Sequence, residues 1–307
     1  MTTEPSDRTI VLNLLRGAVP EKDVELCRLW KEHGHDVEVH SSGPGLTMNA
    51  NIKRIKFDTK TIDFFWLLGF GAWRAIEVYA PALALSSVLG LPLDRALSSD
   101  DELGHLEFDY KQRMAATQKL IIAQQTDDIE WPTDIPQPTS NRGSLRDEQE
   151  MAAFDLVSLA LAFAILHELK HVMFRATGEA PNEGYEEEMA CDTWARSTMT
   201  SNLAEYARQQ NHTFAQVEQK RAMGIALAAI VVHAMTPMHA RWGNEEYPPI
   251  ADRLRAMING YNLPEGSSFW LFTACLLIAI MRQEGRSLDF VAVSNKEVVE
   301  TLLDKLD

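Results

Sequence analysis

The segment "FAILHELKHVMF", residues 163–174, places two histidines and a glutamate in one of the most apolar stretches of the chain. His167 and His171 lie four residues apart, so on a helix both imidazoles project from the same face. Burying them without hydrogen-bond partners is unfavourable, and a divalent metal removes that penalty. Zinc accepts imidazole nitrogens and keeps one position open for water. Glu168 is offset around the helix and reaches that water, so the pattern predicts an H-E-x-x-H hydrolase with Glu168 as general base.

A catalytic zinc held by two histidines needs a third ligand from elsewhere in the chain. The segment "EGYEEEMACDTWARSTM" (183–199) is typical of a second helix, on which Glu188 and Asp192 share a face with small and apolar residues. Carboxylates on an inward face need a metal or a cation. We predict Glu188 as the third ligand and Asp192 as the acceptor that holds the outer N–H of a ligand histidine. Glu187 is the rival ligand, because the sequence does not fix the helix phase to one residue; like Glu186, it also suits a solvated first turn.

Composition limits the kind of protein that carries these residues. The chain has 307 residues, enough for one large domain or two modest ones. Its net charge of −15, without a basic tract, argues against nucleic acid as the main partner. Three scattered cysteines indicate a reducing compartment, and we expect the protein to be cytoplasmic. The apolar runs at 222–232 and 269–281 are shorter than the roughly 20 residues of a bilayer span, so no membrane span is expected.

The elements around the site fall into two regions. Residues 1–60 suggest a small mixed portion, with "RTIVLNLL" (8–15), "DVEVH" (36–40) and "NIKRIKF" (51–57) as candidate strands. Residues 61–307 are predicted to be mostly helical, with the active-site helix at about 148–177 and the third-ligand helix at about 183–209. Between them, the Pro- and Asp-rich residues 126–143 are the best candidate for a loop or lid.

Three motifs together resemble a known group of enzymes. "HELKH" followed by "EMACDTWA" (188–195) looks like the gluzincin metallopeptidases, whose second helix carries a glutamate ligand and an aspartate four residues on. "YPPIADRLRAM" (247–257) is similar to a segment of some of those families in which His-Pro-Pro leads to an Arg-Leu or Arg-Ile pair. The chain length, the aromatic-rich first third and the wording "EEEMACD" resemble most the Lit-type phage-exclusion peptidases.

The resemblance implies a fold and a set of roles. The fold would be α+β and mainly α-helical, with a zincin-like helical core and a small N-terminal α/β portion. His167, His171 and Glu188 would bind one Zn²⁺ per chain, with Glu168 as the catalytic base. Arg253 would anchor the site against Asp192.

Tyr247 marks a departure from the related families, because it stands where their segment often has histidine. Its predicted role is to donate a hydrogen bond to the developing oxyanion. An aromatic ring packed beside two prolines is an equally good interpretation.

The predicted function is a soluble zinc-dependent endopeptidase acting on a cytoplasmic protein. By resemblance it is an antiviral defence protease that excludes phage by cleaving a translation elongation factor. We expect its activity to be gated, either by residues 126–143 or by an activator peptide or protein. The alternative is a non-catalytic binding or regulatory protein with a structural zinc, although such a site has no use for Glu168. A membrane-embedded protease is disfavoured by the short apolar runs.

Overall fold

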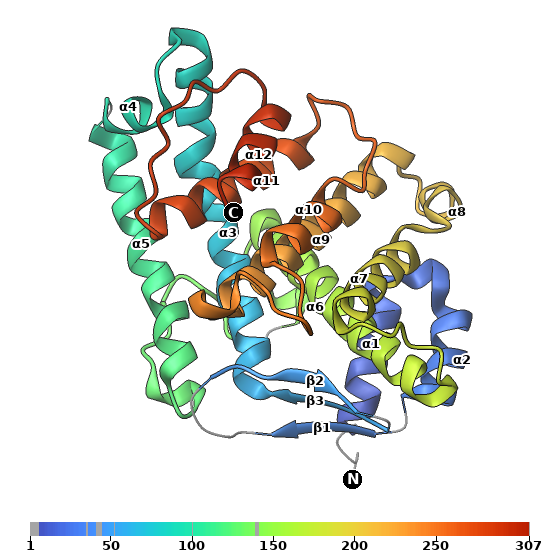
Figure 1. Cartoon of the computed structure of the whole chain (residues 1–307). Coiled ribbons are helices and arrows are strands. Elements are labelled where there is room, and N and C mark those ends of the chain that lie inside the picture. The colour runs from blue at the N-terminus through green and yellow to red at the C-terminus, as the bar shows by residue number, and fades with distance from the viewer. Residues whose placement is uncertain are drawn as a thin grey trace.

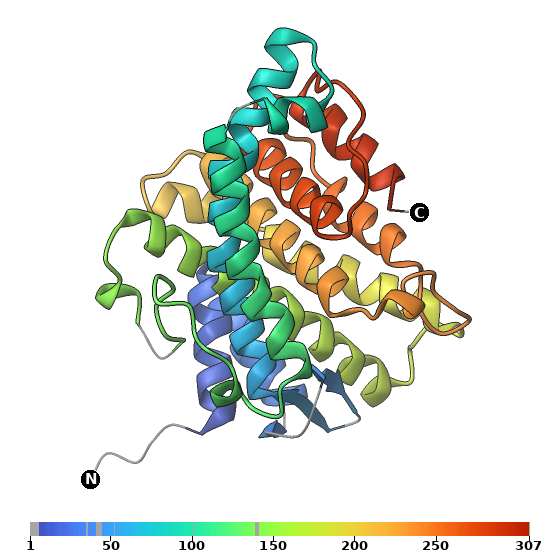
Figure 2. The same ribbon diagram turned by 90° about the vertical axis from the view of Figure 1, so that its left-hand side faces the viewer.

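Two long helices form the centre of the fold: α3 (Thr59–Leu89) and α6 (Glu148–Thr177). The computed structural model describes residues 6–34, 36–40, 45–51, 53–99, 101–138 and 141–306. In it, α6 packs against α3 and α9 (Phe214–Met235), and α11 (Ser268–Gln283) packs against α3 and α9 (Figures 1 and 2). These helices are apolar on almost all sides, as expected for helices in the middle of a domain.

Shorter helices surround this centre. They are α1 (Asp7–Ala18), α2 (Asp23–His33), α4 (Leu93–Ser98), α5 (Asp101–Ile122), α7 (Gly184–Thr200), α8 (Leu203–Gln209), α10 (Ile250–Ile258) and α12 (Asn295–Asp304), with short 3-10 turns η1 (Pro20–Lys22), η2 (Thr126–Asp128), η3 (Arg142–Ser144) and η4 (Met238–Ala240). The predicted third-ligand helix at 183–209 is therefore two helices, α7 and α8. They are separated at Asn202, whose backbone is left-handed with φ 64°.

A small sheet lies at one end of the molecule (Figure 1). Its order is β1 (Asp36–His40), β3 (Arg54–Asp58), β2 (Met48–Ala50), with β1 parallel and β2 antiparallel to β3. The fold class predicted from the sequence, α+β and mainly α, is confirmed. So are the strands predicted at 36–40 and, with shifted bounds, at 51–57; β2 was not predicted.

The strand predicted at residues 8–15 is wrong, because this segment lies in α1. Its buried positions Val11, Leu15 and Ala18 are spaced by four and three residues, which is the spacing of one helix face. The N-terminal portion is joined to the core by a buried ion pair. Arg221 of α9 donates to both carboxylate oxygens of Glu21, at 2.9 and 2.8 Å. The domain boundary at residue 60 remains a prediction.

The helix α6 has well-defined ends. The Asp147 carboxylate accepts a hydrogen bond from the Glu150 N–H at 2.9 Å, and Gly178, with φ 73°, forms the C-cap. Within the described part of the chain, α6 is the one helix long and apolar enough to cross a membrane by composition. However, 67% of its most apolar window is buried inside the protein, as in a core helix.

The close packing of α3 on α6 gives a testable prediction. A Cβ added at Gly69 would lie 2.1 Å from Cγ2 of Val157. We expect Gly69→Ala to lower the free energy of unfolding by about 1–3 kcal/mol, measured by urea denaturation. Gly104→Ala on α5 is the matched control, because its Cβ would meet nothing within 4 Å. Equal urea midpoints for Gly69→Ala and the parent would contradict this close approach.

Candidate metal centre

Three side chains from two packed helices converge at the C-terminal half of α6. His167 and His171 project from α6 and Glu188 from α7, and one ligand atom of each lies within 4.8 Å of the others. The two Nε2 atoms are 3.1 Å apart. The Glu188 carboxylate lies 3.4 Å from Nε2 of His167 and 3.2 Å from Nε2 of His171. Both histidines are 7% exposed. Two imidazole nitrogens and a carboxylate oxygen form a donor set able to hold a metal ion.

The outer nitrogen of each imidazole is bound to a carboxylate. Nδ1 of His167 donates to Asp192 at 2.8 Å, and Nδ1 of His171 donates to Glu187 at 2.6 Å. These bonds hold a proton on each Nδ1 and turn both Nε2 atoms toward the centre of the cluster. The structure therefore places Glu187, the rival ligand in the sequence prediction, against the far side of His171.

The cation Arg253 joins α10 to the same cluster. Its Nε and Nη2 donate to the two oxygens of Asp192 at 2.8 and 2.9 Å. Its Nη1 lies 3.1 Å from Oε2 of Glu188. The planar guanidinium thus compensates two carboxylates at once, which a single ammonium group could not do with the same geometry.

Burial and charge together set the protonation of the metal-free cluster. Burial lowers the pKa of His167, but the Asp192 and Glu188 carboxylates outweigh it and raise that pKa to about 10. Burial raises the pKa of Asp192, but Arg253 and His167 lower it to about 2. The pKa of Glu188 is likewise held below its usual range, against burial, by His167 and His171. The cluster therefore holds ionised carboxylates around an added positive charge, which a divalent cation can replace.

The neighbouring Glu168 differs from the other carboxylates of the cluster. Burial raises its pKa above the usual range, and the positive charges of His167 and His171 oppose this only in part. Glu188 and Arg253 also act on its pKa, so Glu168 belongs to the same electrostatic environment. A carboxyl group with a raised pKa is suited to accept and return a proton.

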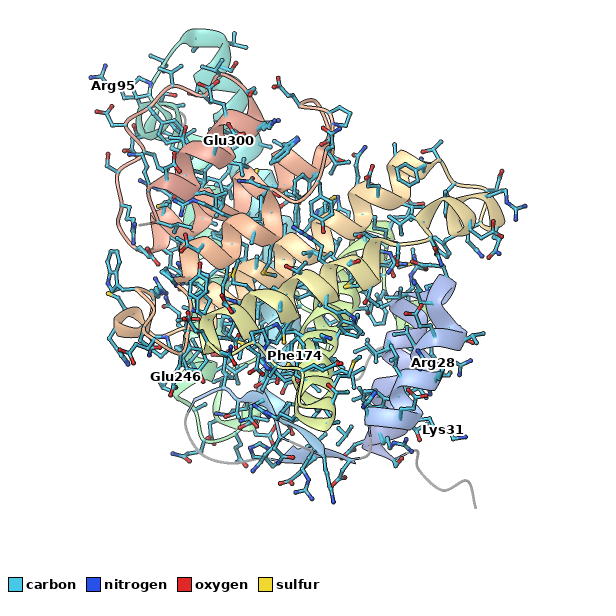
Figure 3. The ribbon with its side chains drawn as sticks, turned by 45° about the vertical axis from the view of Figure 1, so that its right-hand side comes forward. Arg28, Lys31, Arg95, Phe174, Glu246 and Glu300 are labelled. Carbon is cyan, nitrogen blue, oxygen red and sulfur yellow. The ribbon has the colours of Figure 1, made fainter. Side chains whose placement is uncertain are left out.

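The loop before α10 lies against the start of α7. A Cβ at Gly184 would be 2.6 Å from the carbonyl oxygen of Glu246. In Figure 3, Glu246 and Phe174 both lie toward the sheet, at the opposite end from Arg95 and Glu300.

Tyr247 is 52% exposed, and its N–H donates to Oδ1 of Asn244 at 2.8 Å. Within the described residues, no contact joins its hydroxyl to the three converging side chains, so its oxyanion role stays a prediction.

The segment 126–143 lies elsewhere. Nε1 of Trp66 donates to the carbonyl of Pro136 at 2.7 Å, and Arg113 lies 2.6 Å from the Asp134 carboxylate. These contacts attach the segment to α3 and α5. Arg146 also donates to the Asp134 carbonyl just before α6 begins. That end of α6 is roughly 30 Å from His167 along the helix axis, at about 1.5 Å per residue. The start of the segment is held near the beginning of α3, where the Thr126 hydroxyl donates to the Asp63 carboxylate. No hydrogen bond or ion pair of the described residues of this segment reaches the metal cluster.

Comparison with known proteins identifies the family. The family model described as "Peptidase U49" matches residues 55–273, which include the whole cluster. The chain belongs to the Peptidase U49 family. It is similar to the "Cell death peptidase" of Escherichia coli (strain K12), with 20% identity over 281 residues that cover 88% of this chain and 85% of that protein. No solved structure matches. The resemblance to the Lit-type peptidases is confirmed, whereas the binding of zinc stays a prediction.

One role in this U49 peptidase was missed by sequence reasoning. Each ligand histidine requires an acceptor for its Nδ1–H, so two histidines call for two outer carboxylates. Only Asp192 was assigned to this role. The second acceptor, Glu187, lies next to Glu188 in the sequence, and adjacent residues on a helix point about 100° apart. If one acceptor had been required for each histidine, Glu187 would have been a candidate for the second.

Proposed function

We propose that this U49 peptidase is a zinc-dependent endopeptidase. His167, His171 and Glu188 bind one Zn²⁺, and Glu168 is the general base. The single observation that carries the proposal is the convergence of two Nε2 atoms and one carboxylate beside a partly buried glutamate of raised pKa. Two nitrogens and one oxygen suit zinc, whereas calcium and magnesium prefer sites built from oxygen ligands.

Each residue has a separate part in the proposed reaction. When bound, the ion would acidify a water molecule and polarise the scissile carbonyl. Glu168 takes the proton of that water and delivers it to the leaving amine, which matches its raised pKa. Asp192 and Glu187 keep the imidazoles oriented, and Arg253 neutralises the carboxylates that surround them. Tyr247 is proposed as the donor to the developing oxyanion, which requires its ring to turn toward the site when substrate binds.

The proposed biological setting is the cytoplasm, where the enzyme acts in antiviral defence by cleaving a translation elongation factor and so excluding phage. Membership of the family and the name of its relative, "Cell death peptidase", support an activity that harms the cell and is inhibited until it is needed. Because no hydrogen bond or ion pair joins the described residues of 126–143 to the metal cluster, we favour an activator peptide or protein as the gate. Incubating the purified protein with the elongation factor, with and without phage extract, tests this. The appearance of one new N-terminus only with the extract is the expected result.

The metal content of the purified protein tests the site before any substrate is known. We expect close to one zinc per parent chain and almost none in His171→Ala, measured by atomic emission after gel filtration, because three ligands are needed for tight binding. His239→Ala is the matched control, since His239 is exposed on η4. Zinc-free parent protein, or equal zinc in His171→Ala, would exclude the proposed centre.

A further inference from the structure

The molecule has a cavity that is lined by none of the proposed metal ligands. It has a volume of about 550 Å³ and lies between α3, α5, α9 and α11, which are neighbours in Figure 2. Its floor consists of buried apolar and aromatic side chains: Phe64, Leu68, Tyr110, Met114, Leu276 and Ile280. Gln118, Gln283, Pro237 and Met238 lie exposed at its rim. The size and the mainly apolar lining are those of a site for a small organic ligand.

One end of this cavity is polar and carries an ion pair. Arg241 and Glu284 both line this end; Arg241 pairs with the Glu284 carboxylate and donates from Nε to the carbonyl of Thr236 at 3.1 Å. Arg286 does not line the cavity, but it also pairs with Glu284, at 2.9 Å. Two guanidinium groups therefore share one carboxylate, and the second of them adds positive charge next to the cavity.

The imidazole of His233 lies at the same end and is 2% exposed. Its Nε2 is 3.6 Å from the Glu284 carboxylate, beyond hydrogen-bond distance. Burial and the charge of Arg241 lower the pKa of His233 to about 4, so the ring is neutral near pH 7. A neutral imidazole offers one N–H donor to a ligand without adding charge.

We propose that this cavity binds a small apolar molecule with one anionic head, the chemistry of a medium-chain carboxylic acid. The apolar chain lies on the floor formed by α3, α5 and α11. The head group meets Arg241 and the His233 ring. Burying the chain supplies affinity, and the two guanidinium groups that share the Glu284 carboxylate select an acid over an alcohol of the same length.

One wall of the cavity is connected along the chain to the helix that carries Arg253. Residues 235–238 line it and lead through a loop to α10, which carries Arg253. That loop is held by hydrogen bonds: the Ile250 N–H donates to the Arg241 carbonyl at 2.9 Å, and the Asn244 N–H donates to the Tyr247 carbonyl at 2.8 Å. A ligand that fixes Arg241 therefore also fixes the start of α10. The cavity is placed to regulate the metal centre, an inference that rests on the proposed function.

Decanoate, kept below its micellar concentration, is the probe for the ligand site. With the zinc-loaded full chain, we expect saturable binding of one decanoate per chain by calorimetry, and binding of decanol at least tenfold weaker. Ala279→Leu, which fills the cavity from α11, should abolish binding, and Arg241→Met should weaken it.

Arg208→Met is the matched control on an exposed surface and should bind like the parent. Circular dichroism and zinc content verify that each variant folds. Absence of saturable binding to the parent, or undiminished binding to a folded Ala279→Leu, overturns the site.

Zinc affinity tests the regulatory part of the inference separately. We expect saturating decanoate to tighten zinc binding about fivefold or more in chelator competition, with the reciprocal change in decanoate affinity. Unchanged zinc affinity despite saturable decanoate binding overturns regulation and leaves the ligand site intact. If the parent binds decanoate but no zinc, the proposed function fails instead, and with it the regulatory inference.

Discussion

Glu168→Gln is expected to keep its zinc and lose its peptidase activity. Glutamine has the size and shape of glutamate but cannot accept the proton of the attacking water. A positioned general base contributes about 10²–10⁴-fold to such a reaction, so kcat should fall by about that factor. The measurement is cleavage of the protein substrate under single-turnover conditions, with zinc content determined on the same sample.

Glu186→Gln is the matched control for this experiment. Glu186 is exposed on α7, one residue before the carboxylate that holds His171, and the substitution makes the same chemical change. It should retain the parental rate. Undiminished hydrolysis by Glu168→Gln would remove the general-base assignment. An inactive parent with one tightly held zinc would favour the alternative function, a regulatory protein with a structural zinc site.

The residues of the candidate metal site could be predicted from the sequence because they occur in two pairs, each with its members close together in the chain. His167 and His171 are one helical turn apart, as are Glu188 and Asp192, and a spacing of four specifies a shared face without any knowledge of the tertiary structure. The sequence could not distinguish Glu187 from Glu188 as the inward carboxylate. That distinction depends on how α7 is placed, and its first residue, Gly184, packs closely against Glu246, which lies more than 60 residues further along the chain.

Other features depend on tertiary packing and could not be read from local spacing. The apolar run at residues 8–15 is compatible with a strand or a helix. In the structure it is helical and packs against α6. The position of Tyr247 depends on a loop that requires φ 73° at Gly243 and two N–H donations to Asn244. The ligand cavity is made by helices from four separate parts of the sequence, so no single motif marks it.

Arg253→Met is expected to give the largest loss of stability. The substitution leaves the buried Asp192 carboxylate and the partly buried Glu188 carboxylate without the guanidinium that compensates them. Removing one partner of a buried ion pair lowers the free energy of unfolding by about 3–5 kcal/mol. Methionine keeps much of the apolar length of arginine, so lost packing should contribute little. Urea denaturation of the zinc-free protein measures the change, and exposed Arg208→Met should leave the midpoint unchanged.

Two further measurements, zinc saturation and the variant Arg253→Lys, distinguish the loss of the Arg253 charge from the loss of its hydrogen-bond geometry. A bound divalent cation supplies positive charge beside the same carboxylates, so the stability difference between Arg253→Met and the parent should shrink when both are saturated with zinc. Arg253→Lys keeps the charge but cannot reach both oxygens of Asp192 and also Glu188, and should therefore lie between the parent and Arg253→Met. An equal loss with and without zinc would show that Arg253 acts through packing. In that case, the carboxylates around the metal site would not depend on this cation for their charge balance.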